Sequence, residues 1–147
     1  MPIRKMTEAD LPQVLAIQQK LSFQDWSEKV FVSEINASYA LCVVYEREGA
    51  PEILGYAVFH LMGPDSELLS IATDASVQRQ GIGAELLQAG LGKIDLSAGD
   101  KMFLEVREGN EKARRFYERH GFEAYGKRES YYDDGETAIL YRKGQYV

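Results

Sequence analysis

The feature that most constrains the fold is a strand-to-helix junction in the middle of the chain. Residues 68–73 are a continuously apolar run of strand length, and the glycine-rich turn at 81–83 then opens a segment with apolar residues at helical spacing. A second strand-like run at 102–106 and a second helix-like segment at 110–120 follow. Consecutive strands joined through a helix pair in parallel by a right-handed crossover. The middle of the chain therefore predicts parallel strands with helices packed on a sheet.

The segments on either side of this middle add antiparallel strands, which makes the sheet mixed. Thr7 with Asp10 is similar to a capping box at a helix start, and a second helix is expected after Ser27. We predict an α/β fold in a single domain over residues 1–147. The further strands are expected at residues 3–6, 39–45, 53–62, 122–130 and 137–142.

Composition excludes several classes of protein. The chain has 147 residues, 45% of them hydrophobic and 27% charged, which is typical of one globular domain and not of a disordered chain. No apolar run reaches the roughly 18 residues of a membrane span, and no apolar leader is evident. The single cysteine, Cys42, cannot form an internal disulfide, which favours a reducing compartment, and we expect the cytoplasm. The net charge of −6 argues against a nucleic-acid partner. Nothing in the sequence indicates an oligomeric state.

The loop from Gln78 to Ala84 is the strongest local signal for a binding site. The backbone N–H groups that open a helix attract anions, glycines allow close approach of a phosphate, and Arg79 adds positive charge. No Gly-Lys-Ser/Thr follows, and Leu86 stands where a dinucleotide fingerprint needs glycine. A glycine-rich helix cap without a ligand is the alternative interpretation.

Two side chains are candidates for acid–base chemistry. Glu105 interrupts an apolar strand near its carboxyl end, where a carboxylate can serve as a general base. It can equally be an exposed glutamate at a strand end or the ion-pair partner of Arg107. Tyr117 lies on the apolar side of its helix, where it either packs in the core or protonates a leaving thiolate.

Aromatic residues offer weaker candidates for substrate contacts. Tyr131 and Tyr132 either belong to an ordinary hairpin turn or line a peptide channel, and Trp26 either packs in the core or forms a substrate wall. His60 and His120 have no cysteine or acidic ligand pattern near them, so no metal site is expected.

Taken together, these residues resemble the GCN5-related N-acetyltransferase (GNAT) superfamily. Its acetyl-coenzyme A motif, Gln/Arg-x-x-Gly-x-Gly/Ala, is matched by Gln78, Gly81 and Gly83. Further segments are similar to the RimI-like branch of the superfamily and occur in the same order. They are residues 25–31 (Asp-Trp-Ser-Glu-Lys-Val-Phe), 104–107 (Leu-Glu-Val-Arg), Asn110, 116–118, 120–122, 131–132 and 135–139.

The resemblance implies a GNAT fold whose two central parallel strands splay apart, with acetyl-CoA as cosubstrate and no metal. It further implies Glu105 as base, Tyr117 as acid beside the thioester sulfur, and Asn110 as a contact of the coenzyme arm. The backbone contacts it implies are Ile71, Ala72 and Thr73 for the pantetheine, and Arg79, Gln80, Gly81, Ile82, Gly83 and Ala84 for the pyrophosphate. Substrate contacts would come from Trp26, Tyr131 and Tyr132.

The implied reaction is acetylation of a protein N-terminal α-amine by direct attack in a ternary complex. In the RimI-like branch the acceptor is the N-terminal alanine of small-subunit ribosomal protein eighteen. Two alternatives remain open. One is acetylation of lysine side chains or a small amine, and the other is a non-catalytic acetyl-CoA-binding module, against which the presence of both Glu105 and Tyr117 argues.

Overall fold

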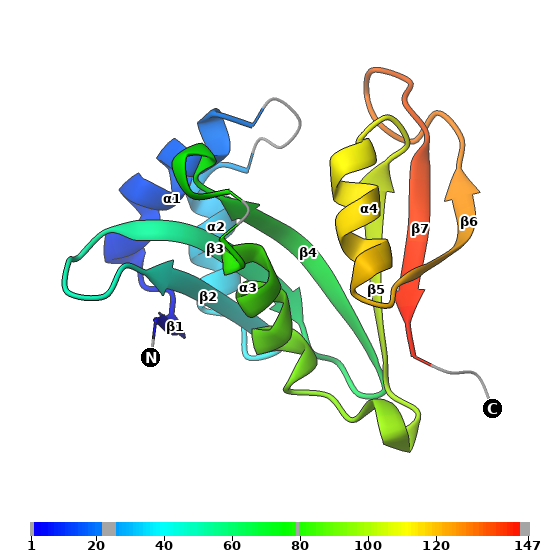
Figure 1. The fold of residues 1–147 in the computed structure, drawn as a ribbon, viewed down its shortest axis with the longest axis horizontal. Helices are drawn as coiled ribbons and strands as arrows, with labels where there is room; N and C mark the ends of the chain where they lie inside the picture. Colours follow the sequence, from blue (N-terminus) through cyan, green and yellow to red (C-terminus); the bar gives the residue numbers. More distant parts are fainter. Residues whose placement is uncertain (1, 22–25, 79, 145–147) are drawn as a thin grey trace. The chain divides into compact units, whose positions relative to one another are not determined.

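A computed structural model describes residues 2–21, 26–78 and 80–144. The chain divides into two compact units, which are described separately below (Figure 1). The first unit comprises Met1–Leu61 and Leu68–Lys93, and the second comprises Met62–Glu67 and Ile94–Val147. Strand β4 (Asp65–Thr73) belongs to both, because its first three residues lie in the second unit. The single domain expected over the whole chain stays a prediction.

The strands form a mixed, mostly antiparallel sheet in the order β1-β2-β3-β4-β5-β7-β6. Pairing is antiparallel between β1 and β2, β2 and β3, β5 and β7, and β6 and β7, and parallel between β4 and β5. The α/β fold class with a central parallel pair is thereby confirmed. The parallel pairing joins Asp65–Glu67 to Lys101–Phe103, inside the second unit. A splay of β4 from β5 beyond this point stays a prediction.

The first unit places helices on both faces of its strands. It holds β1 (Ile3–Lys5), β2 (Ala40–Glu46), β3 (Ile53–His60) and the remainder of β4. On one face, Tyr56 and Val58 of β3 share a core with Phe31 of α2 and with the apolar residues of α1. The other face of β3 meets α3 (Figure 1). There the ring of Phe59 packs against Gly90. The helices are α1 (Leu11–Gln19), α2 (Glu28–Ile35), α3 (Ile82–Leu91) and the 3-10 turns η1 (Glu8–Asp10) and η2 (Ala75–Val77).

Two glycines explain how α3 approaches β3 so closely. A Cβ on Gly90 would lie 2.2–2.5 Å from ring carbons of Phe59, and one on Gly55 would lie 2.9 Å from the carbonyl oxygen of Ala72 and from Leu86. Both distances are far shorter than a carbon contact permits. Gly90 therefore serves close packing between α3 and β3.

The second unit contains β5 (Lys101–Arg107), α4 (Glu111–Arg119), the hairpin β6 (Glu123–Arg128) and β7 (Ala138–Lys143), and the turn η3 (Leu96–Ala98). Burial along β5 alternates, with Met102, Leu104 and Val106 buried and the residues between them half-buried. Tyr141 of β7 lies opposite Leu104 and contacts the ring of Tyr117 in α4. The face of Leu104 and Tyr141 is therefore the face that α4 covers.

The sequence placed most elements correctly but missed three details. Strand β4 begins at Asp65, three residues before the expected start, because its first residues pair with β5 far along the chain. The segment after Thr7 opens with a 3-10 turn, in which the Asp10 carboxylate accepts the Thr7 backbone N–H at 2.8 Å. Strand β5 is not interior on both faces, since every second residue is partly exposed. Within the described ranges, no helix combines the length and apolar character needed to cross a membrane.

Candidate functional site

The first turn of α3 follows a left-handed glycine, Gly81. Gly81 has φ +80°, and among the described residues no atom beyond its chain neighbours lies within 4 Å of the point where a side chain would begin. The Glu85 N–H donates to the Gly81 carbonyl at 3.1 Å, which leaves the N–H groups of Ile82, Gly83 and Ala84 ahead of the helical hydrogen-bond ladder. These amides and the helix dipole favour an anion. Gln80 is exposed beside them, whereas Arg79 lies outside the described residues.

The end of β4 leads directly into this turn. Ala72 is buried, and Ile71 and Thr73 on either side of it are half-buried. The Asp74 N–H donates to Leu54 of β3 at 2.8 Å, which anchors the strand end. The Asp74 carboxylate accepts the Ser76 backbone N–H at 2.9 Å, and this bond is the main reason why the pKa of Asp74 is lowered.

Glu105 lies on the half-exposed face of β5, opposite Leu140 of β7. Its side chain is 28% exposed, and Oε1 is 4.0 Å from Nε of Arg128. The hydroxyl of Tyr131 donates a hydrogen bond to Glu105; the charge of Glu105, followed by this bond, raises the pKa of Tyr131. The pKa of Tyr132 is raised by burial and then by the same charge. Glu105 thus accepts a hydrogen bond from Tyr131, and its charge also acts on Tyr132.

Arg107 is not the ion-pair partner of Glu105, which settles one of the alternatives raised by the sequence. Its Nη1 lies 2.9 Å from Oδ2 of Asp134 and 3.0 Å from Oε1 of Glu136. Its guanidinium carbon lies 4.1 Å from the centre of the Tyr132 ring. Sequence reasoning missed this group, because a charged turn carries no signal for a partner almost thirty residues away.

Tyr117 lies in α4, which covers the other face of the second unit's strands, and Asn110 directly precedes this helix. Asn110 caps the helix by accepting the Ala113 N–H at 3.2 Å. Tyr117 is buried, with its ring 5.7 Å from that of Phe122 and 6.5 Å from that of Tyr141. Burial raises the pKa of Tyr117 well above its usual range, so its hydroxyl is protonated at neutral pH. Tyr117 therefore packs in the core, and it also retains a proton that it could donate.

Trp26 belongs to the first unit and packs at the edge of its core. Its ring centre is 5.2 Å from that of Phe31. The buried side chain of Gln18 holds the Trp26 backbone through two hydrogen bonds, of 2.8 Å to the Trp26 carbonyl and 3.0 Å from its N–H. This arrangement agrees with the core interpretation, and a role in substrate contact stays a prediction. Of the motif at 25–31, Asp25 lies outside the described residues.

Nucleophilic and metal chemistry find little support among the described residues. Cys42 is buried, and burial raises the pKa of its thiol to about 11, so it is not a thiolate at neutral pH. His60 Nε2 lies 2.7 Å from Oε2 of Glu34. Within residues 2–21, 26–78 and 80–144, no group of three histidine, cysteine, aspartate or glutamate side chains could hold a metal ion.

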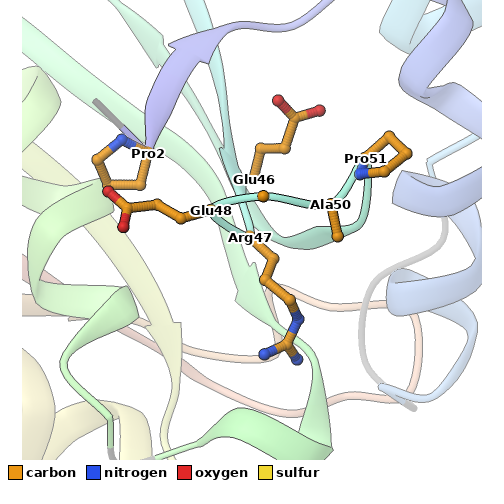
Figure 2. Close-up of a pocket in the computed structure, with 7 residues that line it drawn as sticks. Pro2, Glu46, Arg47, Glu48, Ala50 and Pro51 are labelled. Carbon is orange, nitrogen blue, oxygen red and sulfur yellow. The ribbon is translucent and has the colours of Figure 1, made fainter.

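A polar hollow of about 370 Å³ lies at the turn between β2 and β3 (Figure 2). Arg47 in this turn is occupied by an ion pair with Glu52 at 2.8 Å. None of the residues singled out from the sequence lines it, so it adds nothing to the candidate site. The hollow is lined by Pro2, Glu46, Arg47, Glu48, Gly49, Ala50 and Pro51.

Comparison with known proteins gives consistent matches. Residues 5–122 match the model of the Acetyltransferase (GNAT) family. The "[Ribosomal protein bS18]-alanine N-acetyltransferase" of Escherichia coli (strain K12) is 30% identical over 141 residues, which cover 94% of this chain and 93% of that protein. An N-alpha-acetyltransferase of Sulfurisphaera tokodaii is 28% identical over 151 residues, covering 94% of this chain and 89% of its own length. The crystal structure of the Escherichia coli ribosomal-protein-S18-alanine N-acetyltransferase has a TM-score of 0.82 at 30% identity, with 99% of this chain and 95% of that chain covered.

Proposed function

This chain belongs to the GNAT family and is an acetyl-CoA-dependent N-acetyltransferase, and we propose that its acceptor is the N-terminal α-amine of a protein, namely the N-terminal alanine of ribosomal protein bS18. The observation that carries the proposal is the group around Glu105. A partly exposed carboxylate with the Tyr131 hydroxyl bonded to it and Tyr132 within reach of its charge offers a hydrogen-bond acceptor for an ammonium group and aromatic surface for the residues that follow.

We propose that the coenzyme-binding site is formed by the backbone at the start of α3. The amides from Gln80 to Ala84 would hold the pyrophosphate, and Arg79 is proposed to join them. The left-handed conformation of Gly81 and the open space beside it fit such a ligand. The backbone of residues 71–73 is proposed for the pantetheine arm, and Asn110 for a further contact with it. The coenzyme supplies an acetyl group activated as a thioester.

Glu105 is proposed to take the proton from the acceptor amine, directly or through one water. An amine attacks a carbonyl only in its neutral form. An α-amine has a pKa of about 7.7–8.0, so roughly a third is neutral near pH 7.5, against about a thousandth of a lysine amine with its pKa of about 10.4. A carboxylate is a weak base, and it is therefore better matched to an α-amine than to lysine.

Tyr117 is proposed to return a proton to the leaving thiolate. Its buried hydroxyl is protonated at neutral pH, which is the state that a general acid needs. Glu105 and Tyr117 belong to opposite faces of the second unit's strands.

Transfer is proposed to be direct, because the buried Cys42 thiol is unsuited to carry the acetyl group. Holding both reactants together then supplies much of the rate. Trp26, Tyr131 and Tyr132 are proposed as contacts of the acceptor peptide. A ribosomal acceptor and a single cysteine also suit the reducing cytoplasm, which we propose as the location.

The test offers acetyl-CoA with two peptides of the same sequence, which contains an internal lysine. One peptide begins with a free alanine, and its twin is blocked at the N-terminus. Mass spectrometry should find one acetyl group on the free α-amine and none on the blocked twin. Acetylation of the twin at the same rate would contradict the proposal in favour of lysine transfer. Absence of turnover with intact coenzyme binding would favour a binding module instead.

A further inference from the structure

The loop that carries Tyr131 and Tyr132 is held to β5 by the Tyr131–Glu105 hydrogen bond and by the side chain of Arg107. The Glu108 N–H, just after β5, also donates to the Thr137 carbonyl of the loop at 2.9 Å. We call residues 129–137, which connect β6 to β7, the tyrosine loop. Its centre closes on itself, since the backbone N–H groups of Tyr131 and Tyr132 both donate to the Glu136 carbonyl, at 3.1 and 3.2 Å. These bonds shape the loop, but they do not fix its position against β5.

Arg107 contributes three hydrogen bonds from a single guanidinium nitrogen to this attachment. Nη1 donates to both carboxylate oxygens of Asp134, at 3.1 and 2.9 Å, and to Oε1 of Glu136 at 3.0 Å. The guanidinium carbon also lies 4.1 Å from the centre of the Tyr132 ring. The Arg107 side chain is only 21% exposed, so these charge-assisted bonds are partly shielded from water.

We call the contacts of Arg107 with Asp134, Glu136 and Tyr132 the tether. The second oxygen of Glu136 extends the tether to the start of α4. Oε2 accepts the backbone N–H of Gly109 at 2.9 Å. A Cβ on Gly109 would lie 2.8 Å from this same oxygen, so the glycine leaves the space in which the bond forms. Strand β5, the tyrosine loop and the turn before α4 thus meet at one carboxylate.

Arg107 shares its face of β5 with Glu105, two residues earlier. The tether therefore sets where the Tyr131 hydroxyl and the Tyr132 ring stand relative to the Glu105 carboxylate. We propose that Arg107 is a positioning residue, which holds the tyrosine pair against Glu105 and thereby determines how tightly the acceptor peptide is bound. This inference rests on the proposed function, in which Glu105 receives the acceptor amine.

A positioning role predicts an effect on one substrate and not on the other. Arg107→Gln removes the charge and the Nη1 donor, and it should raise the KM for the alanine-starting peptide by about tenfold or more. The KM for acetyl-CoA should stay within about twofold, because its proposed diphosphate site is in the first unit. Arg107→Lys should recover part of the loss, since it keeps the charge but lacks the planar group that lies over the Tyr132 ring. Asp134→Asn, at a side chain 63% exposed, should give a smaller rise without threatening the fold.

Arg115→Gln is the matched control. Arg115 is 66% exposed, and its nearest acidic partner is Glu111 at 4.0 Å, so its loss should leave both KM values unchanged. Hydrogen–deuterium exchange supplies a readout that does not depend on activity. Exchange in residues 131–136 should be faster in Arg107→Gln than in wild type, and unchanged in Arg115→Gln.

An unchanged peptide KM in both Arg107→Gln and Asp134→Asn would overturn the inference. An equal rise of both KM values in Arg107→Gln would overturn it as well, since it would indicate general loss of structure. Failure of the proposed function looks different, because the wild-type enzyme would then acetylate the blocked lysine peptide or neither peptide. In that case unchanged exchange in Arg107→Gln would still refute the tether, and faster exchange would support it.

Discussion

Replacing Gly81 by alanine tests the proposed coenzyme-binding site most directly. Gly81 has φ +80° and open space around it, so the added methyl group meets no neighbour and acts only through the backbone. The left-handed region costs a residue with a Cβ about 1–2 kcal/mol. If the start of α3 relaxes to avoid this strain, coenzyme binding must restore the left-handed conformation, and the strain then reduces the binding free energy. The Kd for coenzyme A should then rise about 5- to 30-fold, at tenfold for each 1.4 kcal/mol.

Gly49→Ala is the matched control for this change. Gly49 has φ +79°, lies in the same unit, and likewise has no atom within 4 Å of a new Cβ. Both variants should lose about the same stability, with the melting temperature falling by about 2–4 °C for each kcal/mol. Isothermal titration calorimetry should find weaker coenzyme binding in Gly81→Ala alone. Equal Kd values in the two variants, together with equal losses of stability, would refute the coenzyme-binding site on these amides.

Three further predictions concern the reaction and the stability of the first unit. Glu105→Gln should lower turnover of the alanine peptide by about 10²- to 10⁴-fold and leave the coenzyme Kd unchanged; unaltered turnover would remove Glu105 as base. Tyr117→Phe should also lower turnover, measured as release of the coenzyme thiol, and an unaffected rate would remove the acid role. Burial acts to raise the pKa of Asp10, but the hydrogen bonds from Arg4 and Thr7 lower it overall from 3.8. The stability contributed by Asp10 is therefore complete above pH 3.8 and is lost as pH falls through the lower folded value. Asp10→Asn should cost about 1–3 kcal/mol at pH 7 and flatten this acid dependence in chemical denaturation, and an unchanged acid profile would contradict the pairing with Arg4.

Elements defined by local chemistry were predicted well. Ser27 caps α2 by accepting the Val30 N–H at 3.2 Å, Asn110 caps α4, and Gly121 with φ +87° follows the end of α4. Such signals act within a few residues and need no partner from elsewhere in the chain. The start of β4 at Asp65 was missed for the opposite reason, since its hydrogen-bond partners on β5 begin at Lys101.

The candidate site was predicted only as a set of separate residues. The sequence singled out Glu105, Tyr131 and Tyr132, but nothing in the spacing told which of them meet. The hairpin of β7 with β6 and the pairing of β7 with β5 bring the tyrosine loop back beside Glu105. Arg107 was considered only as a partner for Glu105, and the structure pairs it with Asp134 and Glu136 instead.

The sequence by itself determined the order of strands and helices, the caps, the glycine turn at the start of α3 and the family to which the chain belongs, because each depends on residues close together in the chain. Only the tertiary structure decided which face of β5 carries Glu105, that Tyr117 belongs to the opposite face, and which charges hold the tyrosine loop. Those outcomes depend on strand register and on ion pairs between distant segments, and local propensity contains no information about either.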